Sequence, residues 1–130
     1  MEICIESTQE FEQDLAAFSQ TKKANIVNQM NEIFEIISHN PDALFQNMTL
    51  KQFKKIKLNN NYNSSLYSLT LEAKIRIILA IDDDPIFDRT LITLFRIVSA
   101  ENASEAYNSV AESLYQDFTM EKQAVIAVLC

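Results

Sequence analysis

Apolar and polar side chains alternate along three consecutive segments between Ser65 and Ser99. Alternation with a period of two places every second side chain on the same side of an extended chain. A tight turn near Glu72 and a wider one at 82–85, which contains three aspartates and a proline, separate the segments. The pattern therefore predicts a three-stranded antiparallel meander. The positions predicted to share its apolar face are Leu69, Leu71, Ile75, Ile77, Leu79, Ile81, Leu91, Thr93, Phe95 and Ile97.

The opposite face of the predicted meander mixes polar, basic and apolar side chains. This composition is typical of an antiparallel sheet that is covered on one side only. If the strands pair about the wider turn, Arg76 and Arg96 lie near each other on this face. The positions predicted for the mixed face are Ser68, Thr70, Lys74, Arg76, Ala80, Leu94, Arg96 and Val98.

The chain before the meander predicts one strand and two helices. Residues 2–6 alternate like a short strand, which we expect to join the sheet. Ser7 and Glu10 have the spacing of a capping box and predict a first helix that ends near Ser19. A second helix, with apolar residues three and four apart, is expected to run from Thr21 until Pro41 forces it to end. The helical hairpin needs a partner surface for its apolar stripes, and the apolar face of the meander can supply it.

The remaining segments predict two more helices and an ambiguous end. We expect one short helix within 41–63, and a further amphipathic helix that is capped by Asn102 and runs to about Asp117. The apolar end, 119–130, fits either a short helix or an added strand. The predicted fold class is α+β, with an antiparallel sheet of about four strands packed by an N-terminal helical hairpin and a C-terminal helix. Residues 1–118 would form the single domain, and 119–130 an apolar C-terminal extension.

Composition removes several classes of function. The 130 residues include no glycine, which excludes glycine-rich phosphate loops and nucleotide fingerprints. The only histidine and three adjacent aspartates on a turn form no recognisable metal site, so neither a metal nor another cofactor is expected. The net charge of −7 opposes non-specific binding to nucleic acid, although residues 51–96 hold eight bases against five acids.

Cysteine usage and hydropathy indicate the compartment. No apolar run approaches the roughly 20 residues of a spanning helix, so no membrane association is expected. The N-terminus has no basic region before its apolar residues and is not expected to be a secretory signal. Cys4 and Cys130 have no metal-binding spacing, and we expect both to be reduced thiols. These features predict a cytoplasmic protein.

The predicted order of strand, helical hairpin, meander and closing helix resembles the RelE/ParE superfamily of type II toxin-antitoxin toxins. The residues that carry the resemblance are LYSL at Leu66–Leu69, KIRIILAIDDDP at Lys74–Pro85, LITLFRIV at Leu91–Val98 and EAYNSVAESLY at Glu105–Tyr115. The resemblance implies a toxin that a cognate antitoxin protein holds inactive. RelE-like members are metal-free endoribonucleases that cut mRNA on the ribosome, whereas ParE-like members block DNA gyrase and need no catalytic residues. Whether this chain is an enzyme is therefore left open.

The resemblance also implies candidate catalytic residues. Arg76 matches the arginine of the central strand, Lys74 the basic residue before it, and Tyr107 the tyrosine of the closing helix. Lys55 and Lys57 are looser matches to the basic residues that precede the meander. In metal-free RNA cleavage, Arg76 would stabilise phosphate charge and Tyr107 would take part in proton transfer. The family's basic cluster after the last strand is missing, because 99–102 reads SAEN.

Each candidate also has a structural interpretation. Arg76 can pair with an acid or line the antitoxin groove, where Arg96 would join it in binding acids of the partner. The Tyr107 ring can simply pack on its helix stripe, and the lysines can belong to a solvated face. The segment 119–130 is a candidate homodimer or antitoxin contact, unless it folds back on the domain. The alternative function is a non-catalytic, non-toxic protein-binding module that retains the toxin fold.

Overall fold

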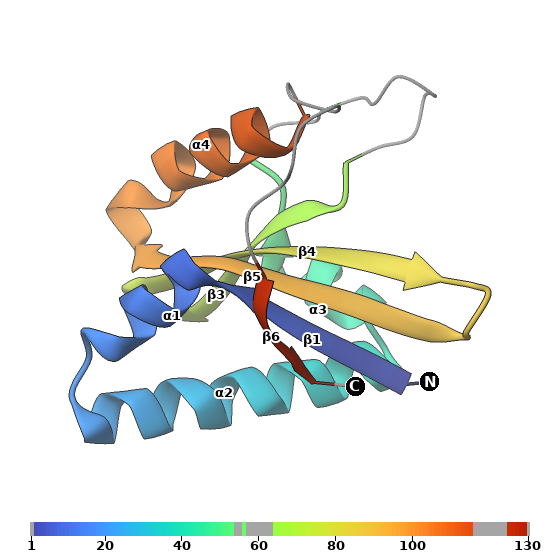
Figure 1. The fold of residues 1–130 in the computed structure, drawn as a ribbon, viewed down its shortest axis with the longest axis horizontal. Helices are drawn as coiled ribbons and strands as arrows, with labels where there is room; N and C mark the ends of the chain where they lie inside the picture. Colours follow the sequence, from blue (N-terminus) through green and yellow to red (C-terminus); the bar gives the residue numbers. More distant parts are fainter. Residues whose placement is uncertain (1, 54–55, 57–63, 116–124, 130) are drawn as a thin grey trace.

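A six-stranded sheet forms the middle layer of the molecule (Figure 1). The computed structural model describes residues 2–53, 56, 64–115 and 125–129. Within these residues the strand order is β2-β3-β4-β5-β1-β6. The strands are β1 (Glu2–Thr8), β2 (Leu50–Lys51), β3 (Leu66–Glu72), β4 (Ile75–Asp84), β5 (Arg89–Ser99) and β6 (Val125–Leu129).

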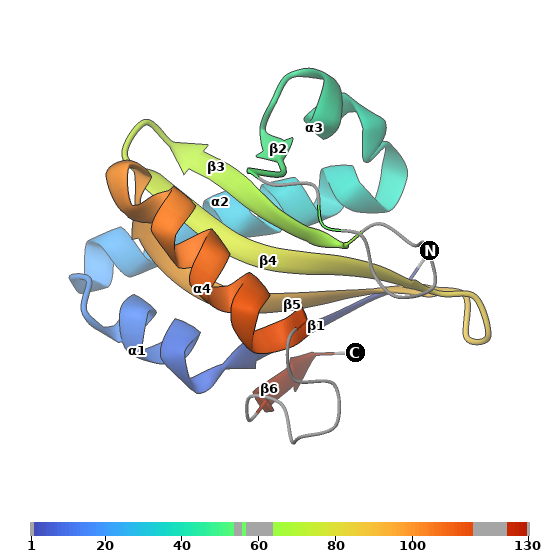
Figure 2. The ribbon, with the colours of Figure 1, turned by 90° about the horizontal axis from the view of Figure 1, so that it is seen from above.

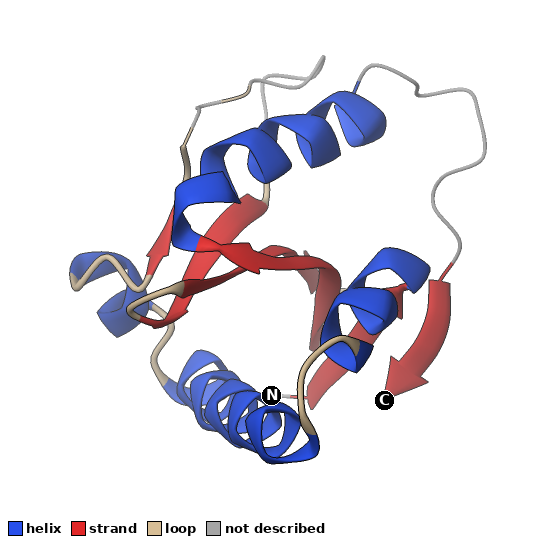
Figure 3. Cartoon of the chain, turned by 90° about the vertical axis from the view of Figure 1, so that its left-hand side faces the viewer, coloured by secondary structure: helices blue, strands red, loops and turns tan. Residues whose placement is uncertain are grey.

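Helices cover both faces of this sheet. Figures 2 and 3 show α4 lying across one face, while α2 runs beneath the other. No described helix is both long and apolar enough to cross a membrane. The helices are α1 (Gln9–Ala16), α2 (Gln20–His39), α3 (Asp42–Gln46) and α4 (Ala103–Tyr115), the last preceded by a 3₁₀ turn, η1 (Ala100–Asn102).

The predicted α+β class, the helical hairpin, the meander and the closing helix are confirmed, but the sheet differs in two respects. It has six strands rather than about four, and it is mixed, because β1 pairs in parallel with β5, from Glu2 opposite Arg89 to Ser7 opposite Leu94. The strand β2 has only two residues, too few to show a period. The ambiguous apolar end contributes β6, which pairs antiparallel with β1.

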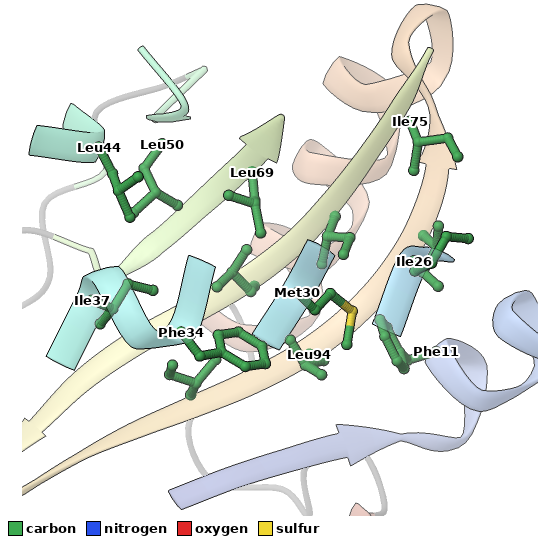
Figure 4. Close-up of a cluster of buried hydrophobic side chains, with 14 residues drawn as sticks. Phe11, Ile26, Met30, Phe34, Ile37, Leu44, Leu50, Leu69, Ile75 and Leu94 are labelled. Carbon is green, nitrogen blue, oxygen red and sulfur yellow. The ribbon is translucent and has the colours of Figure 1, made fainter. Parts of the chain in front are cut away.

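The larger core lies between the sheet and the helices α1, α2 and α3 (Figure 4). Helical spacing aligns Ile26, Met30, Phe34 and Ile37 along α2, and all four are buried. The strand residues that they meet include Leu69, Ile75, Ile77, Leu79, Ile92, Leu94 and Ile97.

A second core lies beneath α4, so the prediction of a sheet covered on one side is wrong. Ala106, Tyr107, Val110 and Ala111 of α4 pack there against Leu66, Ile78, Ala80 and Phe95 of the sheet. The small alanines let the helix approach the strands closely, and the mixed face is therefore largely buried rather than solvated.

A β-bulge in β5 changes which side chains share a face. Ile78 pairs with Arg96 but Leu79 pairs with Leu94, so Phe95 is an extra residue on this strand. Leu94 consequently joins the larger core and Phe95 the core beneath α4. The prediction that Leu91, Thr93, Phe95 and Ile97 share one face is wrong for this reason.

The first helix begins one residue later than predicted and is shorter. Thr8, not Ser7, is its N-cap, since the Thr8 hydroxyl accepts a hydrogen bond of 3.1 Å from the Phe11 N–H. The Ser7 hydroxyl instead donates to Glu12. The helix ends at Ala16 because the Ser19 side chain already caps α2 by accepting from the Lys22 N–H.

Cys4 is fully buried in β1 and is disulfide-bonded, which contradicts the expectation of a reduced thiol. Its sulfur also accepts a hydrogen bond of 3.3 Å from the Arg89 guanidinium. Cys130 lies outside the described residues.

Candidate functional site

Three basic candidates lie where the β3–β4 turn meets the end of β5 and the start of α4. Lys74 is exposed in the turn, Arg76 follows in β4, and Arg96 lies in β5. Arg76 pairs with Val98 and Ile78 with Arg96, so the two arginines are diagonal neighbours on the face that α4 covers. The prediction that they share a face is confirmed.

Arg76 binds the backbone of its own hairpin. Its Nη1 donates to the carbonyl oxygens of Glu72 at 2.8 Å, Ile75 at 3.1 Å and Ala73 at 3.3 Å. Guanidinium groups carry several donors in a fixed plane, which suits them to gathering carbonyls at a turn that has no glycine to relax its geometry. In this arrangement Arg76 stabilises the turn, and its Nη1 faces carbonyls rather than the surface that a phosphate would approach.

Arg96 forms an ion pair with Asp14 of α1. Its Nε lies 2.7 Å from Asp14 Oδ2 and its Nη2 lies 3.1 Å from Oδ1, a bidentate geometry. Asp14 Oδ2 also accepts from the Ile97 N–H at 2.9 Å. The hydrogen bonds that Arg96 donates to Asp14 raise the pKa of its guanidinium. One carboxylate thus ties α1 to β5 beside the bulge.

Two shallow hollows flank these residues. Lys74 borders the first together with Ser99, Ala100 and Glu101, and the Lys74 carbonyl accepts from the Ala100 N–H at 2.9 Å. The second lies between β5 and α4 and measures about 350 Å³. Its lining residues are Arg96, Val98, Asn102, Glu105, Ala106 and Ser109.

Tyr107 lies apart from these hollows, in the core beneath α4. Its side chain is fully buried, and its hydroxyl donates to the Leu66 carbonyl at 3.0 Å. Its ring meets the Phe53 ring edge to face, with centroids 5.6 Å apart. This is the packing role that the sequence left open, and a part in proton transfer stays a prediction. Lys55 and Lys57 lie outside the described residues.

Replacing Tyr107 with phenylalanine is expected to lower the free energy of unfolding by about 1 kcal/mol, because the buried Leu66 carbonyl loses the Tyr107 donor and keeps that of Gln52. Urea unfolding followed by circular dichroism measures this difference. Tyr115→Phe, near the exposed end of the same helix, serves as the control. Equal stabilities of the Tyr107→Phe variant and the wild type would contradict the structural role.

The acids that hold this region were not recognisable in the sequence. Asp14 reaches Arg96 across 82 positions, and Glu72 reaches Lys22 of α2 across 50. Glu72 also accepts from Gln29, two helical turns further along α2. Neither contact leaves a local pattern, since both depend on how the helical hairpin is laid against the sheet.

Glu72 should contribute to the acid sensitivity of the fold. Its hydrogen bond from Lys22, and then that from Gln29, lower its pKa from the ordinary 4.5. Stability from a depressed carboxyl pKa is fully present above the unfolded value and is lost as pH falls through the folded value. The melting temperature of Glu72→Gln should therefore lie below that of the wild type at pH 6, and the difference should shrink towards pH 3. Glu112→Gln, on the exposed side of α4, is the control, and a difference independent of pH would contradict the linkage.

Comparisons with known proteins give one match of note. No protein-family model matches the chain, and no curated protein matches it. Among solved structures it is similar to a YoeB/ParE toxin from Agrobacterium tumefaciens, with 14% sequence identity and a TM-score of 0.44. The match covers 76% of this chain and 98% of that toxin.

Proposed function

We propose that this protein is the toxin component of a type II toxin-antitoxin pair, and that its first partner is a cognate antitoxin. The observation that carries the proposal is the order of elements, because β1, the α1–α2 hairpin, the β3–β4–β5 meander and α4 follow one another as the resemblance implies. We propose that the protein is cytoplasmic, because antitoxins, ribosomes and DNA gyrase are located in the cytoplasm.

The hollow between β5 and α4 is the proposed antitoxin contact. It combines the apolar Val98 and Ala106 with the guanidinium of Arg96, whose side chain is 39% exposed. An amphipathic segment with an acidic residue would place apolar side chains in the hollow and offer its carboxylate to Arg96 in competition with Asp14. Arg76, on the same face, would extend the contact only by giving up part of its bonding to the turn.

The antitoxin contact can be tested with the product of any short reading frame that lies next to the gene for this chain. We expect the purified pair to bind, and Arg96→Ala to weaken binding about tenfold through loss of charge-assisted hydrogen bonds. Calorimetry measures the affinity, and Lys23→Ala on α2 is the control. A neighbouring protein that does not bind, or binds Arg96→Ala as tightly as the wild type, would contradict the proposal.

The proposed target of the toxin is either translation or DNA gyrase. If the protein cleaves mRNA, Arg76 is the residue that would contact the phosphate, with Lys74, Lys55 and Lys57 adding positive charge and Tyr107 moving a proton. That role requires Arg76 to leave the turn carbonyls and the Tyr107 hydroxyl to leave Leu66. Gyrase inhibition requires neither change, because it depends on binding alone.

A second candidate function is a non-catalytic, non-toxic binding module. It is favoured by the engagement of both arginines, Arg76 with the turn and Arg96 with Asp14. Inducing the protein in cells and comparing amino-acid incorporation with plasmid supercoiling separates the candidates. If the wild type lowers amino-acid incorporation and Arg76→Ala does not, the result supports the ribonuclease. If Arg76→Ala lowers incorporation as well, the catalytic role of that residue is removed. Normal growth with both readouts unchanged supports the module.

A further inference from the structure

The tip of the β4–β5 hairpin displays two large apolar side chains. Ile86 is 84% exposed and Phe87 is 67% exposed. The hairpin projects beyond the helices that cover the rest of the sheet (Figures 1 and 2). Single exposed apolar residues are common on proteins, so exposure alone does not define an interface. Here two adjacent ones occupy the turn of a projecting hairpin.

Polar contacts within the tip hold these side chains in place. Asp84 Oδ1 accepts from the Phe87 N–H at 3.4 Å, and Asp84 Oδ2 lies 3.0 Å from Arg89 Nε. The Arg89 guanidinium in turn lies over the Phe87 ring, 5.3 Å from its centroid. A turn that is ordered before binding loses little conformational entropy when a partner arrives. The tip therefore presents Ile86 and Phe87 as a preformed anchor.

The surroundings of the anchor are acidic. Residues 82–88 contain four aspartates and no base, and Arg89 pairs with Asp84. Asp83 and Asp88 are exposed close to the apolar pair in sequence, and Asp82, which is also exposed, accepts a hydrogen bond from the Ser65 hydroxyl. Burial, and then the charge of Asp82, raise the pKa of Tyr67 on the neighbouring strand, which agrees with a negative local field.

We propose that the hairpin tip binds a protein that has an apolar pocket edged by lysine or arginine side chains. Ile86 and Phe87 would fill the pocket, and Asp82, Asp83 and Asp88 would face the basic edge. An anionic lipid surface would repel the same aspartates, and so would a second copy of this chain, which carries a net charge of −7. The tip lies at the opposite end of β4 and β5 from Arg76 and Arg96, so this contact does not depend on the proposed antitoxin site.

A photo-cross-linker placed at Phe87 of the anchor can capture the partner. The full chain, with p-benzoylphenylalanine in place of Phe87, is expressed in its native cells and irradiated, and the cross-linked protein is identified and purified. We expect one predominant protein with a basic surface. Cross-links to lipid alone, to a second copy of this chain, or to nothing would overturn the proposal.

Affinity measurements with the purified partner then test the chemistry. Phe87→Ser should weaken binding about thirtyfold, as expected for an interface anchor. Asp82→Asn combined with Asp83→Asn should weaken it about threefold to tenfold at low salt and have little effect at high salt. Met48→Ser, at an apolar side chain that is 61% exposed elsewhere, should leave affinity unchanged. Equal affinity of Phe87→Ser and the wild type would overturn the proposal, and unchanged melting temperatures show that the variants fold.

Discussion

Replacing Phe11 with alanine should lower the free energy of unfolding by about 3–5 kcal/mol, the range for a buried phenylalanine. Phe11 is the only buried residue of α1, with 2% of its side chain exposed, and it lies in the larger core (Figure 4). Its backbone N–H would still be capped by Thr8 in the variant, so the loss would come from packing. Urea denaturation followed by circular dichroism measures the difference.

The matched control for this substitution is Phe87→Ala. It removes the same atoms from a side chain that is 67% exposed, and it should change the free energy of unfolding by about 0.5 kcal/mol or less. Similar losses in the two variants would show that α1 does not anchor to the core through Phe11. The comparison also shows whether the hairpin tip contributes to stability.

The periodic elements of this fold could be predicted from the sequence. The meander, the α1–α2 hairpin and α4 all have a strong repeat of two or of three and four residues, and each appears in the structure. The bulge at Phe95 could not be predicted, because residues on both sides of it are apolar at odd and even positions alike. The strand β2 was missed because it is held by its neighbour β3 rather than by any pattern of its own.

The covering of the mixed face by α4 was not predicted from the sequence, for a different reason. Arg76 and Arg96 made this face look solvated, yet Arg76 donates to carbonyls of its own turn and Arg96 is paired with Asp14 of α1. The small side chains of α4 leave room for the helix above Ile78 and Ala80. A basic residue on a strand therefore says little about exposure when its partners are distant in sequence.

The candidate site, like the fold, could be predicted from the sequence only in part. The shared face of Arg76 and Arg96 was predicted, but it depends on the bulge at Phe95, because the register next to the turn, with Asp84 opposite Arg89, would by itself place the two arginines on opposite faces. The partner of Arg96 could not be predicted, since Asp14 comes from α1 and depends on tertiary packing, and the local pattern gave no sign that Arg76 donates to the carbonyls of its own turn. For Tyr107, the position on the closing helix was predicted correctly. Its spacing gave no sign that its hydroxyl donates to the Leu66 carbonyl.

Replacing Asp14 with alanine should lower the free energy of unfolding by about 2 kcal/mol, as expected for hydrogen bonds to a charged group. The variant would leave the Arg96 guanidinium without its bidentate partner and the Ile97 N–H without its acceptor. The partial exposure of Arg96, 39% for the side chain, keeps the loss below that of a fully buried pair. Asp83→Ala, at an exposed aspartate of the hairpin, is the control.

A double-mutant cycle separates the two contributions of Asp14. Arg96→Met removes the guanidinium, so adding Asp14→Ala to it should cost less than Asp14→Ala costs alone, the remainder being the Ile97 hydrogen bond. Additive losses would mean that the ion pair contributes nothing to stability. Another substitution at this position, Asp14→Asn, tests partner binding. It weakens the carboxylate that competes, within the chain, with an antitoxin carboxylate for Arg96. That substitution should therefore tighten antitoxin binding while it destabilises the free protein, opposite changes that a purely structural ion pair would not produce.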